Sequence, residues 1–523
     1  MSSKPVRFYA VINPQKQMLP LVYKSVLVGL IGGITVSLFR LTLARAESIS
    51  FAAYAHVREN PVLVLLLFPL LILCGFFLRE LVAHNKAIGG SGIPQVKGVI
   101  LGYLKVNWLR TLIAKFVGTT VSMLAGLSLG REGPSVQLGA SAAEGIGKKL
   151  ASSHTEERIL IASGASAGLA AAFNAPLAGA IFALEEIFKY ISPNILLSTM
   201  LSAITADFVS RVLCGGEPVF DFAVSGSFPL AGYWLLCVLG AVLGALGALY
   251  NLTLLKSQAF LKKVTLGQGR IRLILPFLAA GILGFVFPVV LGGGHAAMAE
   301  LRFTTGIVTM LGIFLLKFVF SMLSFGSGAP GGIFFPLLVL GASAGAVFGK
   351  LSISFLGLSP EVFDSFIVFA MAGYFTAIVR APVTGIILLL EMTGSFANIL
   401  PFALVSSISY VVAELLKSRP IYDSLLDRQL EDAGVSSSVA ASDTKITVEA
   451  VVQHGAGVEN QPVRAIPLPE RCLLLSVRRS GQSLIPKGNT VIRANDTLVF
   501  LLNTDDEREY RPQLAALTSC LNP

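Results

Sequence analysis

Charged residues are scarce in this chain. Asp, Glu, Lys and Arg make up only 13% of its 523 residues, whereas soluble globular proteins carry roughly 25%. The shortage is uneven, because 24 of the 40 basic and 30 acidic residues lie in the final segment, Ser418–Pro523. The composition therefore excludes a soluble globular fold for the first four-fifths of the chain. It indicates a large apolar part followed by a small soluble one.

Several kinds of chemistry are also missing. The 5 cysteines form no CxxC pair and the 5 histidines have no ligand spacing, which argues against a disulfide framework or a metal site. We find no glycine-rich phosphate loop, no nucleophile–base pair and no TVGYG-type potassium filter. We therefore expect no cofactor, no enzymatic activity and no potassium transport. The net charge of +10 fits basic cytoplasmic loops better than a nucleic-acid partner.

Long apolar runs are abundant instead. A helix needs about 20 apolar residues to cross a bilayer. Four runs reach or approach this length: Leu21–Leu43, Pro61–Val82, Tyr233–Leu255 and Ile307–Leu323. Many others are interrupted by the 51 glycines and 25 prolines. Broken helices at membrane depth are tolerated only inside protein or beside a polar cavity, and they mark the binding sites of transporters.

Basic residues precede the first apolar run. Lys4, Arg7, Lys16 and Lys24 lie before it or at its start, with no cleavage site of the kind that a signal peptide carries. The positive-inside rule places this end in the cytoplasm. We expect a multi-pass protein of a bacterial inner membrane, with both termini cytoplasmic.

The apolar part contains an internal repeat. Pro134–Ala142 matches Pro336–Ala344 at an offset of 202, and Ala175-Pro176 matches Ala381-Pro382 at an offset of 206. A pair of glutamates, Glu185 and Glu391, agrees as well. Small-residue helices resemble one another by chance, but here prolines and a glutamate also match. The repeat predicts a duplicated transporter core with its site between the halves. It does not show whether the halves are inverted or parallel.

Three short segments combine glycine and proline where an apolar helix should run: Gly90–Pro94, Gly130–Pro134 and Gly331–Pro336. Proline in a first helical turn fixes a helix start. Each segment therefore predicts a helix N-terminus inside the membrane, with free N–H donors and partial positive charge. Several such ends converging on one point would bind an anion. Partial charges and hydroxyls would also let the anion leave again.

The sequences GSGIP, GREGP and a GxFxP-type segment, in this order and followed by Tyr422, resemble the CLC family of chloride channels and chloride/proton exchangers. The resemblance covers roughly residues 20–430. It implies an all-α inverted repeat of tilted and partial helices, assembled as a homodimer with one pore per subunit. It also implies that the hydroxyls of Ser91 and Tyr422 and the N–H groups of Ile333 and Phe334 bind chloride. Fluoride and nitrate branches depart from the serine, so Ser91 favours chloride, with other halides or nitrate as further substrates.

Glu132, in GREGP, resembles the family's external gate. An ionisable residue inside a membrane is costly and by default functional. Ionised, it would compete with chloride for the outer part of the anion site; protonated, it would swing away and carry a proton. The alternative is that Glu132 only pairs with Arg131.

Glu186 aligns with the family's internal proton-transfer glutamate, where exchangers usually have an acid and many channels a valine. Its neighbour Glu185 has a repeat mate in Glu391, which argues for a packing or capping role. Glu186 has none, because Met392 stands at the matching position. Proton transfer is therefore the expectation for Glu186, and a structural role is the alternative.

Three basic residues have supporting roles. Lys115 matches a buried basic position of the family, where it would raise the local positive potential or form a structural ion pair. Arg131 is expected to support the site electrostatically and structurally rather than as a ligand. Arg380, in Ala377–Pro382, is expected at a loop or helix end.

After Tyr422 the chain becomes soluble in composition. We predict a transport domain over 1–430 with halves at about 20–215 and 228–430, a linker over 431–443 and a small domain over 444–523. Strands are expected at Lys445–Val452, Cys472–Val477 and Thr497–Leu502, turns at Ser480-Gly481 and Lys487–Asn489, and a helix at Glu507–Leu517.

This segment resembles the α+β C-terminal domain of potassium-transport regulators, the RCK/TrkA C type. Such domains usually dimerise, and some bind small cytoplasmic ligands such as cyclic dinucleotides. A role in dimer stability alone is the alternative.

Three functions remain open at this point. The leading hypothesis is chloride/proton antiport, with chloride and protons as substrates. A passive, voltage- or pH-gated chloride channel on the same fold is the first alternative. A membrane-bound sensor or scaffold that acts through its C-terminal domain is the second.

Overall fold

The computed structural model describes residues 14–189, 192–216, 222, 228–264, 271–394, 396–433, 445–479, 482–503 and 506–519. Lys4 and Arg7, on which the prediction of topology drew, lie outside the described residues, as does the predicted turn at Ser480-Gly481. The chain forms two compact units, Met1–Leu426 and Asp427–Pro523, which are considered separately.

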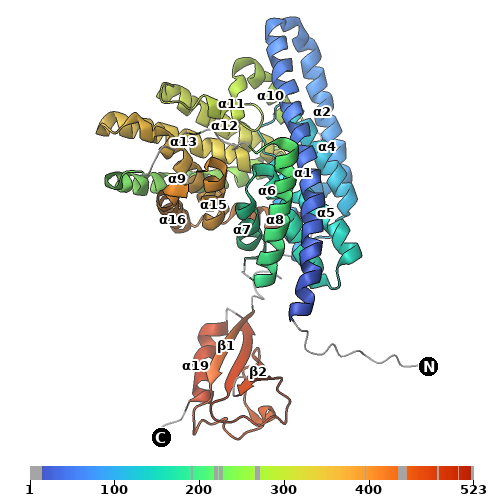
Figure 1. Cartoon of the computed structure of the whole chain (residues 1–523), viewed down its shortest axis with the longest axis vertical. Coiled ribbons are helices and arrows are strands. Elements are labelled where there is room, and N and C mark those ends of the chain that lie inside the picture. Colours follow the sequence, from blue (N-terminus) through green and yellow to red (C-terminus); the bar gives the residue numbers. More distant parts are fainter. Residues whose placement is uncertain are drawn as a thin grey trace, which may run out of the picture. The chain divides into compact units, whose positions relative to one another are not determined.

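The first unit is helical throughout. Its first half contains α1 (Pro14–Glu59), α2 (Val64–His84), α3 (Ile93–Ile100), α4 (Trp108–Leu124), α5 (Glu132–Leu150), α6 (His154–Phe173), α7 (Pro176–Phe182), a π-helical turn (Ala183–Phe188) and α8 (Pro193–Cys214). Its second half contains α9 (Tyr233–Val264), α10 (Leu275–Val286), α11 (His295–Ala299), α12 (Ile307–Gly326), α13 (Phe334–Leu356), α14 (Phe363–Val379), α15 (Pro382–Thr393) and α16 (Ile399–Leu415). In Figure 1 the long helix α1 runs beside α8.

The two halves repeat one order of elements, which confirms the internal repeat. The short helices α3 and α11 occupy matching places, as do α5 and α13. The helices α7 and α15 both begin at the proline of an Ala-Pro pair. Each of the three predicted helix starts is also present, at Ile93, Glu132 and Phe334. The glycine–proline stretches therefore interrupt the membrane helices where the sequence indicated.

Among the described residues, eight helices are long and apolar enough to cross a membrane. All four predicted runs fall within them. Three of the interrupted helices, α4, α5 and α6, do not reach this threshold. The pair α5 and α6 is held by close packing of small residues, which is common between membrane helices. At the α5–α6 contact, a methyl group on Gly139 would overlap the carbonyl oxygen of Gly164, and the reverse is also true.

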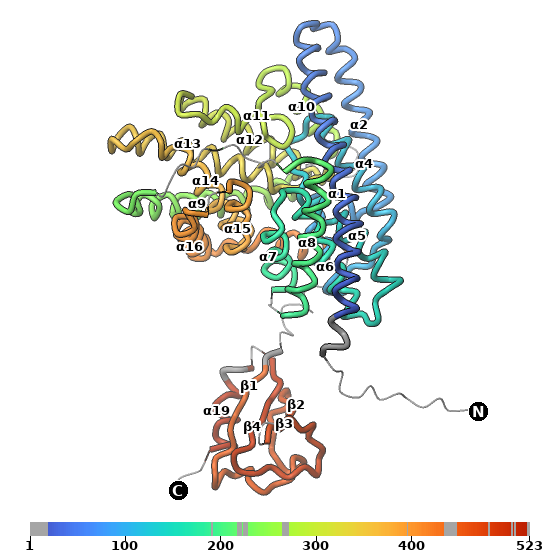
Figure 2. The backbone as a smooth tube through the Cα atoms, in the orientation of Figure 1, coloured from blue at the N-terminus to red at the C-terminus, as the bar shows by residue number. Residues whose placement is uncertain are grey.

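The second unit carries an antiparallel sheet in the order β1-β4-β2-β3. Its elements are β1 (Lys445–Val451), β2 (Leu473–Arg479), β3 (Gln482–Leu484), β4 (Thr497–Asn503) and α19 (Glu507–Thr518), which Figure 2 shows as a tube. The three predicted strands, the helix and the turn at Lys487 are confirmed. Strand β3 is a short edge strand with all three residues exposed, and the apolar pattern used for the prediction missed it.

The helix α17 (Ile421–Asp432) follows the second half. It extends two residues into the range predicted as a linker, and most of the remaining linker lies outside the described residues. Tyr422 stands in its first turn.

Candidate anion and proton site

The three glycine–proline stretches meet at one point. Gly130 and Gly332 pair as an antiparallel bridge, each donating its N–H to the other's carbonyl at 2.7 Å. Gly90 joins them, because Gly331 donates to the Gly90 carbonyl at 3.1 Å. The N-termini of α3, α5 and α13 are thereby fixed together. Their first N–H groups lack a preceding helical turn to accept them, so the cluster has the donors and partial charge that an anion requires.

Ser91 lies directly before α3 in this cluster. Ser91 is 2% exposed, and its hydroxyl has no hydrogen-bond partner among the described residues. The hydroxyl lies so close to Gly133 that a methyl group there would overlap it. The following residue, Gly92, has φ of +106°, a backbone region that favours glycine. An unsatisfied buried hydroxyl is uncommon in a native protein and needs an explanation.

Tyr422 brings a second hydroxyl of the same kind. The residue is fully buried and its hydroxyl has no partner in the described part of the chain. It interacts electrostatically with both Glu132 and Glu186. The phenol is therefore close enough to interact with both glutamates that the sequence singled out.

Glu132 is the first residue of α5 and is fully buried. One carboxylate oxygen accepts a hydrogen bond from the N–H of Phe335 at 3.3 Å, and the other has no partner in the described structure. Among the described residues Glu132 and Arg131 form no salt bridge, although the charge of Arg131 acts on the carboxylate, so the gate and the Glu132–Arg131 pair both stay predictions. The carboxylate occupies a helix N-terminus that would otherwise serve an anion.

Glu186 lies in the π-helical turn and is 2% exposed. Its carboxylate accepts a hydrogen bond from Lys97 Nζ at 3.0 Å. Lys97 also pairs with Asp423, the residue after Tyr422, and Asp423 pairs in turn with Lys189. The neighbouring Glu185 has a different environment and faces the second half of the repeat.

Lys115 supports the Ser91 loop. Its ammonium group, fully buried on α4, donates to the carbonyls of Ile88 and Gly90 at 2.9 and 2.6 Å. No carboxylate pairs with it in the described residues, so the predicted alternative of a structural ion pair is wrong. Lys115 lies beside the Ser91 loop, and the other expectation, a raised local potential, stays a prediction.

Lys317 is the repeat mate of Lys115, which sequence analysis overlooked. On α12, it donates to the carbonyls of Val290 and Gly292 at 3.0 and 2.8 Å. The lysine and both acceptors lie 202 residues after their counterparts in the first half. The offset alone could have identified this lysine.

A small, partly open pocket lies beside Glu132. Arg131, Glu47 and His295 contribute to its lining. The Nε atom of Arg131 and one carboxylate oxygen of Glu47 are buried without partners in the described chain. Arg131 is thus a half-buried cation at the mouth of the site, consistent with electrostatic support.

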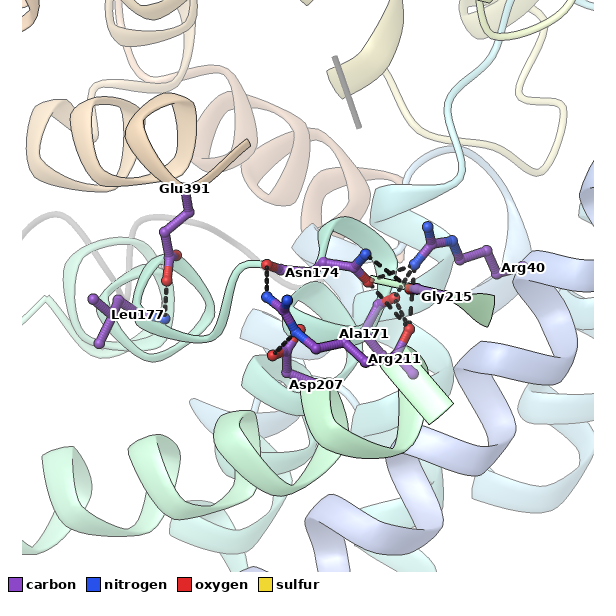
Figure 3. Close-up of polar contacts among 9 residues, drawn as sticks. Arg40, Ala171, Asn174, Leu177, Asp207, Arg211, Gly215 and Glu391 are labelled. Atoms are coloured by element: carbon purple, nitrogen blue, oxygen red, sulfur yellow. Dashed lines mark hydrogen bonds and ion pairs between the residues drawn. The ribbon is translucent and has the colours of Figure 1, made fainter. Parts of the chain in front are cut away.

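The glutamates Glu185 and Glu391 cap helices across the repeat. Glu185 accepts from the N–H groups of Val383 and Thr384 at 3.1 and 2.7 Å, at the start of α15. Glu391 accepts from Leu177 and Ala178 at 3.0 and 2.8 Å, at the start of α7. Figure 3 shows Glu391 reaching Leu177. The expected capping role of this pair is confirmed.

The ends of α6 and α14 are also fixed by polar contacts. Asn174 and Arg380 are both left-handed C-caps before an Ala-Pro pair, so Arg380 is a helix-end residue as predicted. Arg380 donates to the carbonyls of Tyr410 and Ser418. Asn174 accepts from Arg40 at 2.7 Å, and its carbonyl accepts from Arg211, as Figure 3 shows.

Comparison with known proteins agrees with this architecture. Residues 70–414 match the model of the voltage gated chloride channel family, and residues 447–515 match the TrkA-C domain. The chain belongs to the CLC family.

Its relatives in this family include exchangers. The H(+)/Cl(-) exchange transporter ClcA of Salmonella paratyphi A is 33% identical over 429 residues, which cover 79% of this chain and 90% of that protein. ClcA of Klebsiella pneumoniae is 33% identical over 80% of this chain and 91% of that protein. The crystal structure of a slow cyanobacterial Cl-/H+ antiporter is similar with a TM-score of 0.74 at 28% identity, covering 81% of this chain and all of that one.

The CLC site described here contains residues that sequence analysis did not single out: Glu47, Lys97, His295, Lys317 and Asp423. Lys97 and Asp423 carried a usable signal, because each is a charge close to a residue already assigned to the site. Glu47 and His295 carried none, since only the folded chain brings them to Glu132.

Proposed function

We propose that this CLC protein is a secondary active antiporter that exchanges chloride for protons across a bacterial inner membrane. The observation that carries the proposal is a pair of buried glutamates in the same unit, Glu132 at the N-terminus of α5 and Glu186 in the π-helical turn. A passive channel needs one gate at most, whereas an exchanger needs a proton acceptor toward each side. The exchangers among its relatives favour the same function.

The chloride-binding residues in this proposal are Ser91 and Tyr422, through their hydroxyls, and Ile333 and Phe334, through their N–H groups. Both hydroxyls are buried and lack partners among the described residues. Ile333 and Phe334 stand at the start of α13, where N–H groups point outward from the helix end. Hydroxyls and amides bind chloride moderately, which suits turnover.

Glu132 is the external gate in this scheme. Its carboxylate takes the Phe335 N–H that an anion would otherwise use. Once protonated, the carboxyl loses its attraction to the helix N-termini and yields that place to chloride. Proton binding and chloride binding are therefore linked at one position. Glu186 exchanges the proton on the other side.

The protein is further proposed to act as a homodimer, with each subunit carrying its own site. Its TrkA-C domain is proposed to lie in the cytoplasm and to bind a small ligand there, such as a cyclic dinucleotide. Other halides and nitrate are proposed as additional substrates.

Purified protein in liposomes with a chloride gradient tests the function. We expect chloride flow to drive protons in the opposite direction, and Glu132→Gln to abolish proton movement while chloride still moves. Glu186→Val should also lose proton movement. Glu144→Gln is the matched control, because Glu144 is a buried glutamate of the same helix that pairs with Lys148 at 2.5 Å. Unchanged coupling in Glu132→Gln would contradict the assignment, and chloride flux without protons in the native protein would make it a channel.

A further inference from the structure

Four charged side chains form a continuous chain from solvent to Glu186. The exposed fraction of the side chain is 48% for Lys189, 21% for Asp423, 5% for Lys97 and 2% for Glu186. Lys97 Nζ donates to Glu186 Oε1 at 3.0 Å and also to Oδ1 of Asp423. Lys189 donates to the other carboxylate oxygen, Oδ2. Each group touches the next, so the chain has no gap between the partly exposed carboxylate and the buried one.

Stability alone does not account for this arrangement. Burying an ion pair costs desolvation, and replacing it with apolar side chains is often neutral or stabilising. Glu185 illustrates the structural use of a glutamate here, since it satisfies backbone N–H groups of α15. Glu186 has no such donor among its described hydrogen bonds, and its partner is the side chain of Lys97.

The same elements carry the proposed chloride ligands. Lys97 belongs to α3, whose N-terminus follows Ser91, and Asp423 directly follows Tyr422 on α17. The Tyr422 hydroxyl also interacts electrostatically with Glu186. The proposed chloride ligands and this chain of charges are therefore carried by the same two helical segments.

We propose that Asp423 and Lys97 form the route by which protons pass between solution and Glu186. The inference rests on the proposed antiport. An Asp423 carboxylate oxygen takes a proton from a hydronium ion in solution and leaves water. The Lys97 ammonium gives one proton to Glu186 Oε1, and the resulting amine takes the proton from Asp423. One proton has then moved from solution to Glu186, and Lys97 and Asp423 have their starting charges again. The reverse sequence releases a proton.

Lys189 has a different part in this route. It is the exposed end of the chain of charges and contacts only Asp423 within it. It therefore orients the Asp423 carboxylate without standing between Asp423 and Glu186.

The substitution Lys97→Arg distinguishes proton transfer by Lys97 from charge pairing alone. The guanidinium group keeps the positive charge and donates to both carboxylates, but it does not give up a proton in proteins. If Lys97 only provides a positive charge, Lys97→Arg should preserve coupling. If Lys97 transfers protons, Lys97→Arg should lose it.

The experiment uses full-length protein in liposomes with simultaneous recording of chloride and proton flux. Positioned acid–base groups typically contribute about a hundredfold or more. We therefore expect Lys97→Arg, Lys97→Met and Asp423→Asn each to lower proton flux about tenfold or more. Chloride flux should persist in each, which also shows that the variants are folded. Lys148→Gln, at the far end of α5, is the control and should behave as the native protein.

Native coupling in Lys97→Arg would overturn the relay through Lys97, and native coupling in Asp423→Asn would overturn Asp423 as the entry point. If Lys97→Met loses both fluxes, Lys97→Arg and Asp423→Asn still decide between the outcomes. Failure of the proposed function has a distinct result: the native protein itself would move chloride without protons. That result would overturn the relay as well.

Discussion

The two halves of the membrane unit agree at some buried polar positions and differ at others. Four of the agreeing residues contact backbone. Lys115 and Lys317 each hold two loop carbonyls. Glu185 and Glu391 each cap a helix of the opposite half. These duplicated residues hold loops and helix ends in place. Each contact occurs once in each half, because the two halves repeat the same order of helices.

The positions that differ are those proposed to handle ions. At the repeat offsets, Ser91 corresponds to Gly293, Glu132 to Phe334, Glu186 to Met392 and Lys97 to Ala299. The first half thus supplies side chains with hydroxyls and charges, and the second half supplies N–H groups at the start of α13. Among these residues, the duplicated ones hold backbone groups and the unduplicated ones are proposed to handle ions.

The largest effect should come from the duplicated lysines. Lys317→Met removes the donor to the Val290 and Gly292 carbonyls, whereas Lys115→Met removes the donor to the Ile88 carbonyl and leaves the Gly90 carbonyl its bond from Gly331. An unsatisfied buried carbonyl costs about 1–3 kcal/mol, so we expect both variants to lower the thermal unfolding temperature, Lys317→Met more than Lys115→Met. Only Lys115→Met should also weaken chloride binding, because Lys115 lies beside Ser91. Titration calorimetry with chloride measures the chloride affinity of both variants. Equal loss of chloride binding in both variants would break the comparison.

A smaller and equal loss of stability is expected for the capping glutamates. Glu185→Gln and Glu391→Gln keep the shape but lose the negative charge that strengthens hydrogen bonds to a helix N-terminus. Each should cost about 0.5–2 kcal/mol, measured as a shift in unfolding temperature against the native protein. The proton/chloride ratio should stay native in both. If Glu185→Gln changed the proton/chloride ratio, a duplicated residue would take part in transport, and the contrast between duplicated and unduplicated residues would fail.

Removing a hydroxyl from the proposed chloride site should act on binding without a matching loss of stability. Ser91→Ala and Tyr422→Phe remove groups that have no partner among the described residues, so the fold loses no hydrogen bond. A hydrogen bond to a charged partner contributes about 1.5–3 kcal/mol, hence chloride affinity should fall about tenfold or more. Ser343→Ala is the control, because its buried hydroxyl donates to the Val339 carbonyl. Native affinity in both site variants would contradict the assignment.

The smallest effect concerns a buried acid outside the repeat. Burial of Asp496 opposes its ionisation, but hydrogen bonds from Arg479 and from the Arg493 N–H outweigh this and hold the pKa of Asp496 below 3.8. The ionised Asp496 should therefore stabilise the sheet fully at pH values above 3.8, the pKa of this group in the unfolded chain. The stabilisation should be lost as the pH falls through the lower pKa that Asp496 has in the folded protein. In that acidic range, the hydrogen-exchange rate of the β4 amides in the full-length protein, corrected for intrinsic rates, should rise. The substitution Asp496→Asn should remove the dependence, and an identical acid response in the native protein and the variant would refute it.

Much of this structure could be predicted from the sequence. Glycine–proline stretches predicted the starts of α3, α5 and α13, because proline and glycine impose local backbone geometry. The repeat predicted the shared cap of Glu185 and Glu391. The sequence did not reveal the ion chain, since Lys97, Glu186 and Asp423 come from three distant segments that only tertiary packing brings together. It also left Lys115 open, because a buried lysine has several ways to be satisfied and only the fold selects one.

The most direct test of the account is proton movement against its own gradient in the native protein. Liposomes loaded with chloride, with equal pH on both sides, are diluted into low-chloride buffer while external and internal pH are recorded. The account predicts that chloride leaving the vesicles draws protons inward, so that the interior becomes acidic although no proton gradient was applied. Chloride efflux with a steady internal pH, under conditions where a proton ionophore still produces a response, would contradict it.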